Sequence, residues 1–345
     1  MFDVNEVIMI IVLKPNTSDA QLDEVFQLAK KHGYDPKIIR GVERTILACV
    51  GDERSHDTLE TFISLPAVES VTPIQKKYKL VSRDFKPTDT TFKIQDIEVG
   101  YPHFQVIAGP CSVEGYQQAK LTAARVKELG ATFFRAGAFK PRTSPYDFQG
   151  LGKEGLKILR QIHDETKLPI VTEVMSPSEA DLVAEFSDVL QIGTRNAQNY
   201  PLLIAAAKTG KPILLKRGFA STVVEWLLAA EYVASHGNDK IILCERGIRT
   251  FETSTRNTLD LSAVAVAKSE THLPIFVDPS HAAGRSDMVL PLAKAAIAVG
   301  ADGLLVEVHP NPTEAWSDDD QQLNFEQFKT FMEEIKPFLN VVGRK

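Results

Sequence analysis

The chain of 345 residues is 43% hydrophobic and carries a formal net charge of −6. This length and apolar content allow a large core divided into more than one domain, and the negative charge argues against nucleic acid as a partner. No apolar run reaches the roughly 18 residues needed to cross a bilayer, and residues 1–15 lack the features of a secretion signal. Three cysteines in so long a chain argue against a disulfide scaffold. We therefore expect a cytoplasmic protein that binds neither nucleic acid nor membrane.

The first part of the chain, residues 1–82, is predicted to fold as a small α+β domain. Its apolar runs and helical spacings follow one another in the order βαββαβ, which is the ferredoxin-like arrangement and leaves one face of the sheet for a partner or a ligand. The polar, aperiodic residues 83–91 are predicted to be a linker. The expected strands lie at 7–13, 37–40, 45–50 and 68–80, and the expected helices at 18–32 and around 59–63.

Residues 92–345 are predicted to form a (β/α)8 barrel, the TIM-barrel fold. Eight short apolar runs alternate with amphipathic segments over roughly 240 residues, the usual size of such a barrel. An open doubly wound sheet is the alternative, but it normally has fewer strands, and no GxGxxG follows the first one. Residues 92–99 are expected to form an extra strand pair at the barrel bottom. The expected barrel strands lie at 104–108, 132–136, 169–172, 188–192, 212–215, 240–244, 274–277 and 302–306.

Cationic side chains follow many of these strands, at the end of a barrel where active sites lie. Arginine forks match phosphate oxygens and lysine adds a point charge, so their convergence in an acidic protein suits phosphorylated small molecules that carry a carboxylate. Each residue alone is as readily a solvated loop cation, but six at matched positions argue against coincidence. The six are Arg135, Lys140, Arg142, Arg195, Lys216 and Arg246.

A second set of strand-end residues has the character of metal ligands. Cys111, His281 and Glu307 end strands one, seven and eight, which become neighbours when the barrel closes, and the acidic run 318–320 follows shortly after. A mixture of thiolate, imidazole and carboxylates suits Zn, Fe, Mn or Co and does not suit Mg or Ca. The pattern therefore predicts a divalent transition-metal site without choosing the metal.

The motifs at the strand ends resemble those of 3-deoxy-D-arabino-heptulosonate 7-phosphate (DAHP) synthase, the family that opens the shikimate pathway to aromatic amino acids. The sister family, 3-deoxy-D-manno-octulosonate 8-phosphate synthase, typically has Lys-Ala-Asn-Arg-Ser where residues 140–144 read Lys-Pro-Arg-Thr-Ser. The resemblance thus favours erythrose 4-phosphate over arabinose 5-phosphate as the sugar. It covers about residues 100–340 through AGPCSVE (108–114), RAGAFKPRTSPYDFQGLG (135–152), QIGTRN (191–196), LLKRG (214–218), CERG (244–247), VDPSHAAGRSD (277–287) and EVHPNP (307–312).

The resemblance implies roles for individual residues. The metal would be held by Cys111, His281, Glu307 and Asp318, with the neighbouring Asp319 and Asp320 as alternatives to Asp318. The second substrate, phosphoenolpyruvate, would be held by Arg135, Lys140, Arg195, Lys216 and Arg246, and the sugar phosphate by Arg142, Thr143 and Ser144.

These roles suggest a mechanism with two further catalytic assignments. The metal would polarise the aldehyde, Lys140 would protonate the nascent alkoxide, and Glu173 would position the water that adds to C2 of phosphoenolpyruvate before phosphate leaves. One rival is a metal-independent Schiff-base aldolase with Lys216 as nucleophile. Another is a catalytically dead sensor that binds an amino acid through residues 1–80, which the intact ligand set disfavours.

The N-terminal segment resembles the ferredoxin-like regulatory domain that some members of this family carry, where an aromatic end product binds. The resemblance implies feedback inhibition by Phe or Tyr and assembly into a homo-oligomer, a tetramer. A purely structural or oligomerising role for this domain is the alternative.

Overall fold

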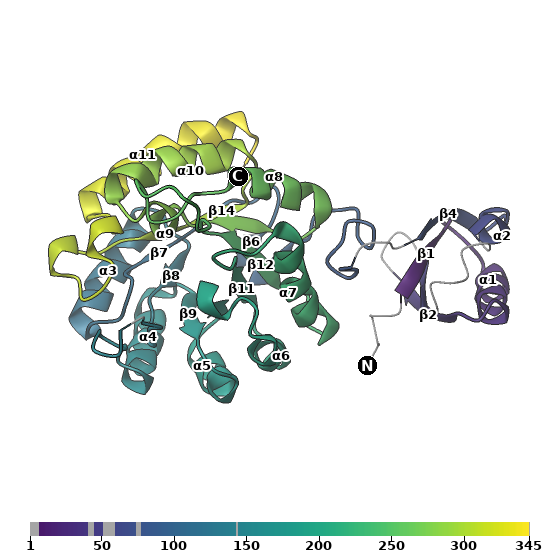
Figure 1. The fold of residues 1–345 in the computed structure, drawn as a ribbon, viewed down its shortest axis with the longest axis horizontal. Helices are drawn as coiled ribbons and strands as arrows, with labels where there is room; N and C mark the ends of the chain where they lie inside the picture. The colour runs from purple at the N-terminus through teal and green to yellow at the C-terminus, as the bar shows by residue number, and fades with distance from the viewer. Residues whose placement is uncertain (1–6, 41–44, 51–58, 74–76, 143, 345) are drawn as a thin grey trace. The chain divides into compact units, whose positions relative to one another are not determined.

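The computed structural model describes residues 7–40, 45–50, 59–73, 77–142 and 144–344. The chain divides into two compact units, Met1–Pro87 and Thr88–Lys345, and each unit is described by itself (Figure 1). No helix in the described part of the chain is long and apolar enough to span a bilayer.

The N-terminal unit has the ferredoxin-like fold that the sequence predicts. Its antiparallel sheet has the order β2-β3-β1-β4, so the first strand lies in the middle between the third and the fourth. Ser18 and Gln21 form a capping box at the start of α1, and Leu22, Val25 and Ala29 face the sheet core. The elements are β1 Val7–Leu13, α1 Asp19–Lys31, β2 Asp35–Arg40, β3 Thr45–Val50, α2 Leu59–Ile63 and β4 Val68–Pro73.

The last strand of this unit is shorter than the expected 68–80. It ends at Pro73, whose nitrogen carries no hydrogen for a further ladder bond. Residues further along the chain, Leu80 and Phe85, pack against Ile10 and Ala48 on the sheet face opposite the helices. The segment after the last strand therefore covers part of the sheet face that the predicted fold leaves for a partner or a ligand.

The second unit is a closed barrel of eight parallel strands, as predicted. The strands follow the order β10-β11-β12-β13-β14-β7-β8-β9, and β14 pairs with β7 to close the circle. Helices surround the strands (Figure 1). The strands are β7 Gln105–Gly109, β8 Phe133–Arg135, β9 Ile170–Val174, β10 Val189–Ile192, β11 Ile213–Lys216, β12 Ile241–Glu245, β13 Ile275–Val277 and β14 Gly303–Glu307. The α-helices are α3 Tyr116–Glu128, α4 Lys153–Thr166, α5 Ala180–Phe186, α6 Tyr200–Lys208, α7 Val223–Ser235, α8 Leu261–Glu270, α9 Pro279–Ala283, α10 Val289–Ala298 and α11 Phe325–Val341.

A short antiparallel hairpin closes one end of the barrel. It consists of β5 Phe92–Ile94 and β6 Ile97–Val99, as expected for residues 92–99. Ile94 and Val99 pack with the apolar side chains that fill the barrel interior, among them Ile107 and Phe133. Because the hairpin covers the end where the strands begin, the carboxyl ends of the strands are left to form the site.

Candidate active site

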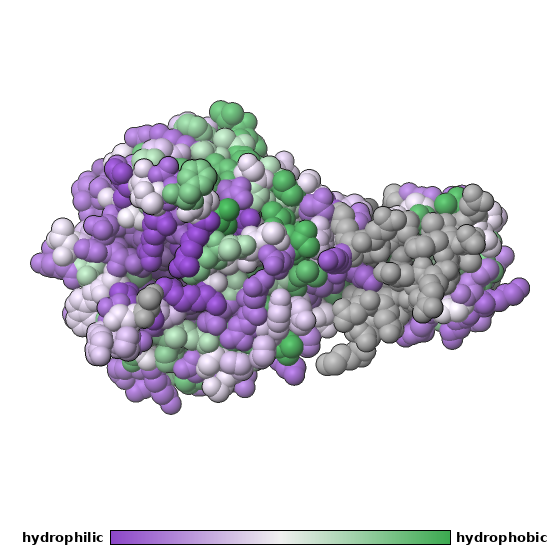
Figure 2. Space-filling model, in the orientation of Figure 1, coloured by the Kyte–Doolittle hydropathy of each residue, from purple (hydrophilic) through white to green (hydrophobic). Residues whose placement is uncertain are grey.

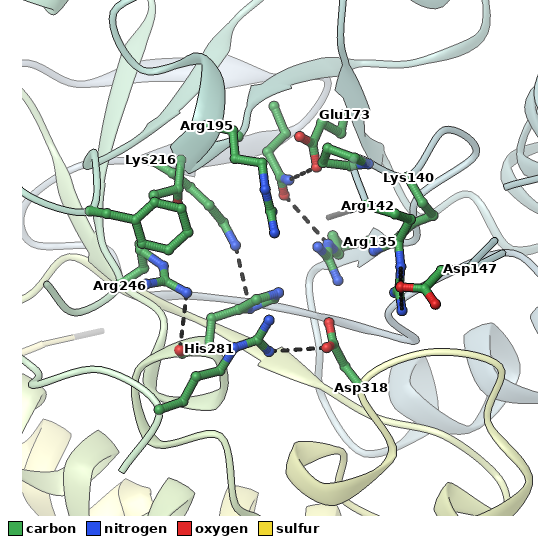
Figure 3. A pocket seen from close by; sticks show the side chains of 16 residues that line it. Arg135, Lys140, Arg142, Asp147, Glu173, Arg195, Lys216, Arg246, His281 and Asp318 are labelled. Carbon is green, nitrogen blue, oxygen red and sulfur yellow. Dashed lines mark hydrogen bonds and ion pairs between the residues drawn. The ribbon is translucent and has the colours of Figure 1, made fainter. Parts of the chain in front are cut away.

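One pocket of about 150 Å³ lies where the barrel strands end, and all six predicted cations line it (Figure 3). Strongly hydrophilic residues also gather on the surface over β7 and β8 (Figure 2). Phe219 joins the cations, with its ring centre 5.1 Å from the guanidinium of Arg246 and 5.7 Å from that of Arg195. The full lining is Arg135, Lys140, Pro141, Arg142, Asp147, Glu173, Gln191, Gly193, Thr194, Arg195, Lys216, Phe219, Arg246, Arg256, His281 and Asp318.

Arg246, directly after β12, is a buried cation whose contacts are to neutral groups. It donates to the carbonyl oxygens of Gly247 at 3.3 Å and His281 at 3.1 Å. Its Nε finds no hydrogen-bond partner among the residues that the structure describes. Burial lowers the pKa of Arg246 to about 10. A buried guanidinium that donates hydrogen bonds only to neutral carbonyl oxygens is a strong binding site for an anion.

Lys216, at the end of β11, is held by a buried carboxylate. Its Nζ lies 2.6 Å from Oδ2 of Asp278, and the same oxygen is 2.7 Å from Nδ1 of His281. Burial alone would raise the pKa of Asp278, but His281 and Lys216 hold it well below its usual range. Asp278 therefore stays ionised and orients both side chains, with Nε2 of His281 left to face the centre of the site.

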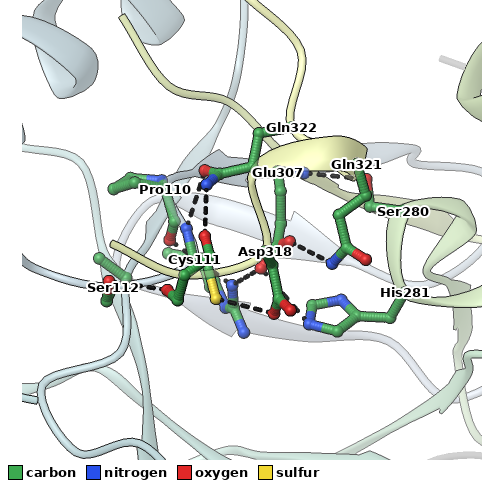
Figure 4. A network of polar contacts seen from close by, with 12 residues as sticks. Pro110, Cys111, Ser112, Ser280, His281, Glu307, Asp318, Gln321 and Gln322 are labelled. Atoms are coloured by element: carbon green, nitrogen blue, oxygen red, sulfur yellow. Dashed lines mark hydrogen bonds and ion pairs between the residues drawn. The ribbon is translucent and has the colours of Figure 1, made fainter. Parts of the chain in front are cut away.

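Three of the four predicted metal ligands meet beside this pocket, and the fourth, His281, lies next to Glu307 (Figure 4). One ligand atom each of Cys111, Glu307 and Asp318 lies within 4.8 Å of the others. The Cys111 sulfur is 3.0 Å from Oδ2 of Asp318, and Nε2 of His281 is 3.3 Å from Oε1 of Glu307. Asp319 and Asp320 are exposed and outside this cluster, so the geometry favours Asp318 among the three aspartates.

The protonation states of these four groups suit a cation, with one exception. Burial lowers the pKa of His281, which keeps its imidazole neutral. Burial would raise the pKa of Glu307 and Asp318, but His281 and nearby cations lower both, so the two carboxylates are ionised. Burial raises the pKa of Cys111 to about 12. The thiol therefore keeps its proton at neutral pH until a cation displaces it.

Lys140 approaches the same sulfur from the side of the pocket. Its Nζ lies 2.8 Å from the Cys111 sulfur and 3.0 Å from the Cys111 carbonyl oxygen. Arg135 forms a buried ion pair with Glu307. Both cations thus stand at the boundary between the metal ligands and the pocket.

Glu173, at the end of β9, points one carboxylate oxygen into the pocket (Figure 3). Its Oε2 accepts a hydrogen bond from Gln191 at 3.2 Å, whereas its buried Oε1 has no partner within the described part of the chain. A Cβ at Gly193 would lie 2.0 Å from that Oε1. Glycine is needed at position 193 because a side chain would collide with Glu173. Backbone conformation does not require it, since the φ of −72° is open to any residue.

Comparison with known proteins decides the family. A model of the DAHP synthetase I family matches residues 81–340, and a model of the DAHP synthase ferredoxin-like domain matches residues 9–76. The chain belongs to the DAHP synthetase I family. A phospho-2-dehydro-3-deoxyheptonate aldolase from Thermotoga maritima is 51% identical over 98% of this chain and 99% of its own length.

Solved structures from that family agree with the fold. The crystal structure of phospho-2-dehydro-3-deoxyheptonate aldolase (DAHP synthase) from Thermotoga maritima matches with a TM-score of 0.77 and 50% identity over 98% of both chains. A truncated form of the Thermotoga maritima synthase matches with a TM-score of 0.73 and 51% identity over 78% of this chain and 98% of its own. The sister family is more distant, since a 2-dehydro-3-deoxyphosphooctonate aldolase from Syntrophotalea carbinolica is 34% identical over 71% of this chain and 94% of its own length.

Of the residues predicted to hold the sugar phosphate, Arg142 alone is among the described residues that line the pocket. Arg142 lines the pocket and pairs with Asp147 at 3.3 Å. Thr143 lies outside the described residues. Ser144 does not line the pocket as described, and its hydroxyl accepts a hydrogen bond from the backbone nitrogen of Tyr146. The roles of Thr143 and Ser144 remain predictions.

Several residues of the site carry no signal in the spacing of residues. Gln191 lies inside a strand and joins Glu173 to Arg135, where its Oε1 accepts from Nε at 3.4 Å. Arg256 lies in an irregular loop and Gln321 in a short 3-10 helix, Asp319–Gln321, both away from any strand end, yet both reach the metal ligands. An internal strand position and two positions away from the strand ends could not be singled out from residue spacing alone.

Proposed function

We propose that this chain condenses phosphoenolpyruvate with D-erythrose 4-phosphate and water to give DAHP and phosphate, in a reaction that depends on a divalent metal. Membership of the family assigns the DAHP synthase reaction, the first step of the shikimate pathway, to this chain. The observation that carries the proposal is the buried Arg246, which lines the pocket with six further cations and whose Nε has no hydrogen-bond partner among the described residues. A phosphorylated carboxylate supplies the charges that this pocket lacks.

The four predicted ligands fit a divalent transition metal. Cys111, His281, Glu307 and Asp318 combine a soft donor, a borderline donor and two hard donors, as Mn, Fe, Zn or Co accept. When bound there, the cation would supply Lewis-acid polarisation of the aldehyde carbonyl.

The side chains of the pocket divide the remaining tasks. Arg195 and Arg246 bind the phosphate of phosphoenolpyruvate, Lys140 lies near its carboxylate and reacting carbons, and Arg135 and Lys216 complete the set of cations that holds it. Lys140 also donates the proton to the nascent alkoxide. These contacts fix the substrate against the metal ligands, since Lys140 touches Cys111 and Arg135 touches Glu307. Arg142, with Thr143 and Ser144, holds the sugar phosphate.

The choice of sugar is tested by a direct comparison of substrates. The purified chain, supplied with manganese, is given phosphoenolpyruvate with either erythrose 4-phosphate or arabinose 5-phosphate, and the loss of phosphoenolpyruvate is followed. We expect consumption with erythrose 4-phosphate only. A preference for arabinose 5-phosphate would keep the barrel chemistry but contradict the assignment of residues 140–144. The absence of any reaction would favour the sensor alternative.

Glu173 positions the water that adds to C2 of phosphoenolpyruvate, and its free oxygen supplies the acceptor. Glu173→Gln should lower kcat by about 100-fold or more with little change in either KM, since a positioned acid–base group contributes roughly 10²- to 10⁴-fold. Gly193→Ala should cause a similar loss, because the new methyl group takes the space of Oε1. Steady-state kinetics of both variants check this. A normal kcat in Glu173→Gln would remove Glu173 from the reaction.

A Schiff-base mechanism through Lys216 fits the site less well. The buried ion pair with Asp278 suits a lysine that stays charged and clamps an anion, whereas a nucleophilic lysine must be neutral. Trapping with borohydride in the presence of substrate distinguishes the two, and we expect no covalent adduct.

We also propose that the ferredoxin-like unit takes up Phe or Tyr as a feedback inhibitor and that the chain assembles as a homotetramer. The match of residues 9–76 to the DAHP synthase ferredoxin-like domain supports the regulatory role. Turnover measured with each amino acid tests the first part, and light scattering tests the second. Full activity at saturating Phe and Tyr would leave a structural role for this unit.

A further inference from the structure

The loop after β12 sends one arginine across to the metal ligands. Arg256 NH1 donates to Oδ1 of Asp318 at 3.0 Å and to Oε1 of Gln321 at 2.9 Å. Its backbone nitrogen is bound to the carbonyl of Ala283, in the helix that carries His281. One residue thus connects, through its backbone and its side chain, the segments that follow β12, β13 and β14.

Gln321 continues this connection to the second carboxylate. It is 1% exposed, accepts from Arg256 through Oε1 and donates to Oε2 of Glu307 through Nε2. Its amide therefore has a partner on each side, and Figure 4 shows it beside Glu307. The two residues form a continuous bridge between Asp318 and Glu307 on the outer side of the ligand cluster.

The bridge uses one oxygen of each carboxylate and leaves the other. In Asp318, Arg256 takes Oδ1, while Oδ2 faces the Cys111 sulfur at 3.0 Å. In Glu307, Gln321 takes Oε2, while Oε1 faces Nε2 of His281 at 3.3 Å and also accepts from Arg135. The oxygens that face the other ligands are those that the bridge does not occupy.

We propose that Arg256 and Gln321 are paired positioning residues that select which oxygen of Asp318 and of Glu307 binds the cation and hold each carboxylate to a single metal contact. The inference rests on the metal site of the proposed function. A carboxylate kept to one contact leaves coordination positions open for a substrate oxygen, as a catalytic metal requires. Groups that orient ligands in this way commonly change metal affinity when they are replaced.

The local backbone is arranged to let the bridge form. Gly284 has φ of +70°, and a Cβ there would lie 2.4 Å from Cβ of Arg256, so the missing side chain makes room for the arginine. Asp318 has φ of +52°, a conformation that few residues other than glycine adopt but that aspartate tolerates. Its contact with Arg256 helps hold the carboxylate in this orientation.

The positive charge of Arg256 and its role in positioning Asp318 affect metal binding in opposite directions. A cation beside a metal site repels the metal, so removal of the charge would strengthen metal binding, whereas loss of positioning would weaken it. The informative variants therefore conserve charge. Arg256→Lys keeps the positive charge but loses the planar fork, and Gln321→Met keeps length and neutrality but loses both hydrogen bonds.

The experiment measures the manganese dissociation constant of the full chain by competition with a chelating dye. Arg256→Lys and Gln321→Met should each raise it by roughly 10- to 100-fold. The double variant should have the same manganese dissociation constant as whichever single variant binds manganese less tightly, because the two side chains act as one unit. Arg285→Lys is the matched control, since this arginine pairs with Asp287 in a neighbouring pocket and has no hydrogen bond or ion pair with a predicted ligand among the described residues. It should bind manganese like the unchanged chain.

Binding of phosphoenolpyruvate to the metal-free chain separates positioning from general damage. The change in phosphoenolpyruvate affinity should be much smaller than the change in manganese affinity, because Arg256→Lys keeps the positive charge where Arg256 lines the pocket, and Gln321 is not among the described residues that line it. Unchanged manganese binding in both single variants would overturn the inference, as would a parallel loss of phosphoenolpyruvate affinity. If the unchanged chain itself failed to bind manganese, the metal part of the proposed function would fall and the inference with it.

Discussion

Cys111→Ala should abolish turnover and reduce bound metal to background. The sulfur is the soft donor of the set, and it lies at the centre of the polar network, in contact with Asp318 and Lys140. Its loss removes the soft donor and leaves one imidazole and two carboxylates, a three-ligand set that should bind a transition metal far more weakly. Metal analysis and steady-state kinetics give the two readouts. Cys49→Ala is the matched control, because Cys49 is buried in the core of the N-terminal unit, whereas every predicted ligand belongs to the barrel unit.

The pH dependence of metal binding follows from the same thiol. Burial raises the pKa of Cys111 to about 12, whereas the pKa of His281 and of both carboxylates is lowered. Near neutral pH only the thiol carries a proton that the metal must displace, so binding should release about one proton and strengthen about tenfold per pH unit. Calorimetry in buffers of different protonation enthalpy measures the released proton. Metal binding without proton release, or full activity in Cys111→Ala, would contradict the assignment.

Arg246→Met should remove phosphoenolpyruvate binding without lowering the stability of the fold. Loss of a buried guanidinium that binds phosphate should weaken affinity by about 100-fold or more, since truncating one partner of a buried charge pair costs roughly 2–5 kcal/mol. The folded-state pKa of about 10 lies below the ordinary 12.5, so the charged form is disfavoured by burial. The charge therefore opposes folding throughout the range below pH 10, by roughly 3 kcal/mol at 1.36 kcal/mol per pH unit.

Arg217→Met is a control for which we expect the opposite result, a loss of stability of the fold. Arg217 is also buried, but it pairs with Glu245 and Asp260 at 2.9 Å each, and these hydrogen bonds help to raise its pKa despite the opposing effect of burial. Its removal leaves Glu245 as an unpaired buried charge and should cost about 3–5 kcal/mol. Thermal denaturation should thus show a clear fall in Tm for Arg217→Met and none for Arg246→Met. A similar fall in both would mean that Arg246 is a structural residue.

The architecture was predictable because each barrel strand is a short apolar run between amphipathic helices. The run at 188–192, for example, corresponds to Val189–Ile192, where all four residues are buried. The position of the cations was predictable for the same reason, because the end of each strand defines where the next side chain points. Arg246 follows Glu245, the last residue of its strand, and faces the pocket as expected.

The contacts between loops could not be predicted. Residues 256 and 318 are 62 positions apart, and neither lies in a periodic segment that would place one against the other. Gly193 likewise shows in the sequence only as a glycine after a strand, while its purpose depends on where Glu173 directs its carboxylate. The end of β4 at Pro73 is not visible in the sequence, because the apolar spacing continues to Leu80, which packs across the sheet instead of extending the strand. Such features depend on tertiary contacts rather than on local pattern.

The most direct test of metal-dependent condensation is one assay of the full chain with phosphoenolpyruvate and erythrose 4-phosphate. Loss of phosphoenolpyruvate and release of phosphate are followed before treatment with a chelator, after it, and after addition of manganese. We predict equal loss and release in the untreated chain, neither after chelation, and recovery of both with manganese. Turnover that persists at the same rate after complete removal of metal would contradict the role assigned to Cys111, His281, Glu307 and Asp318.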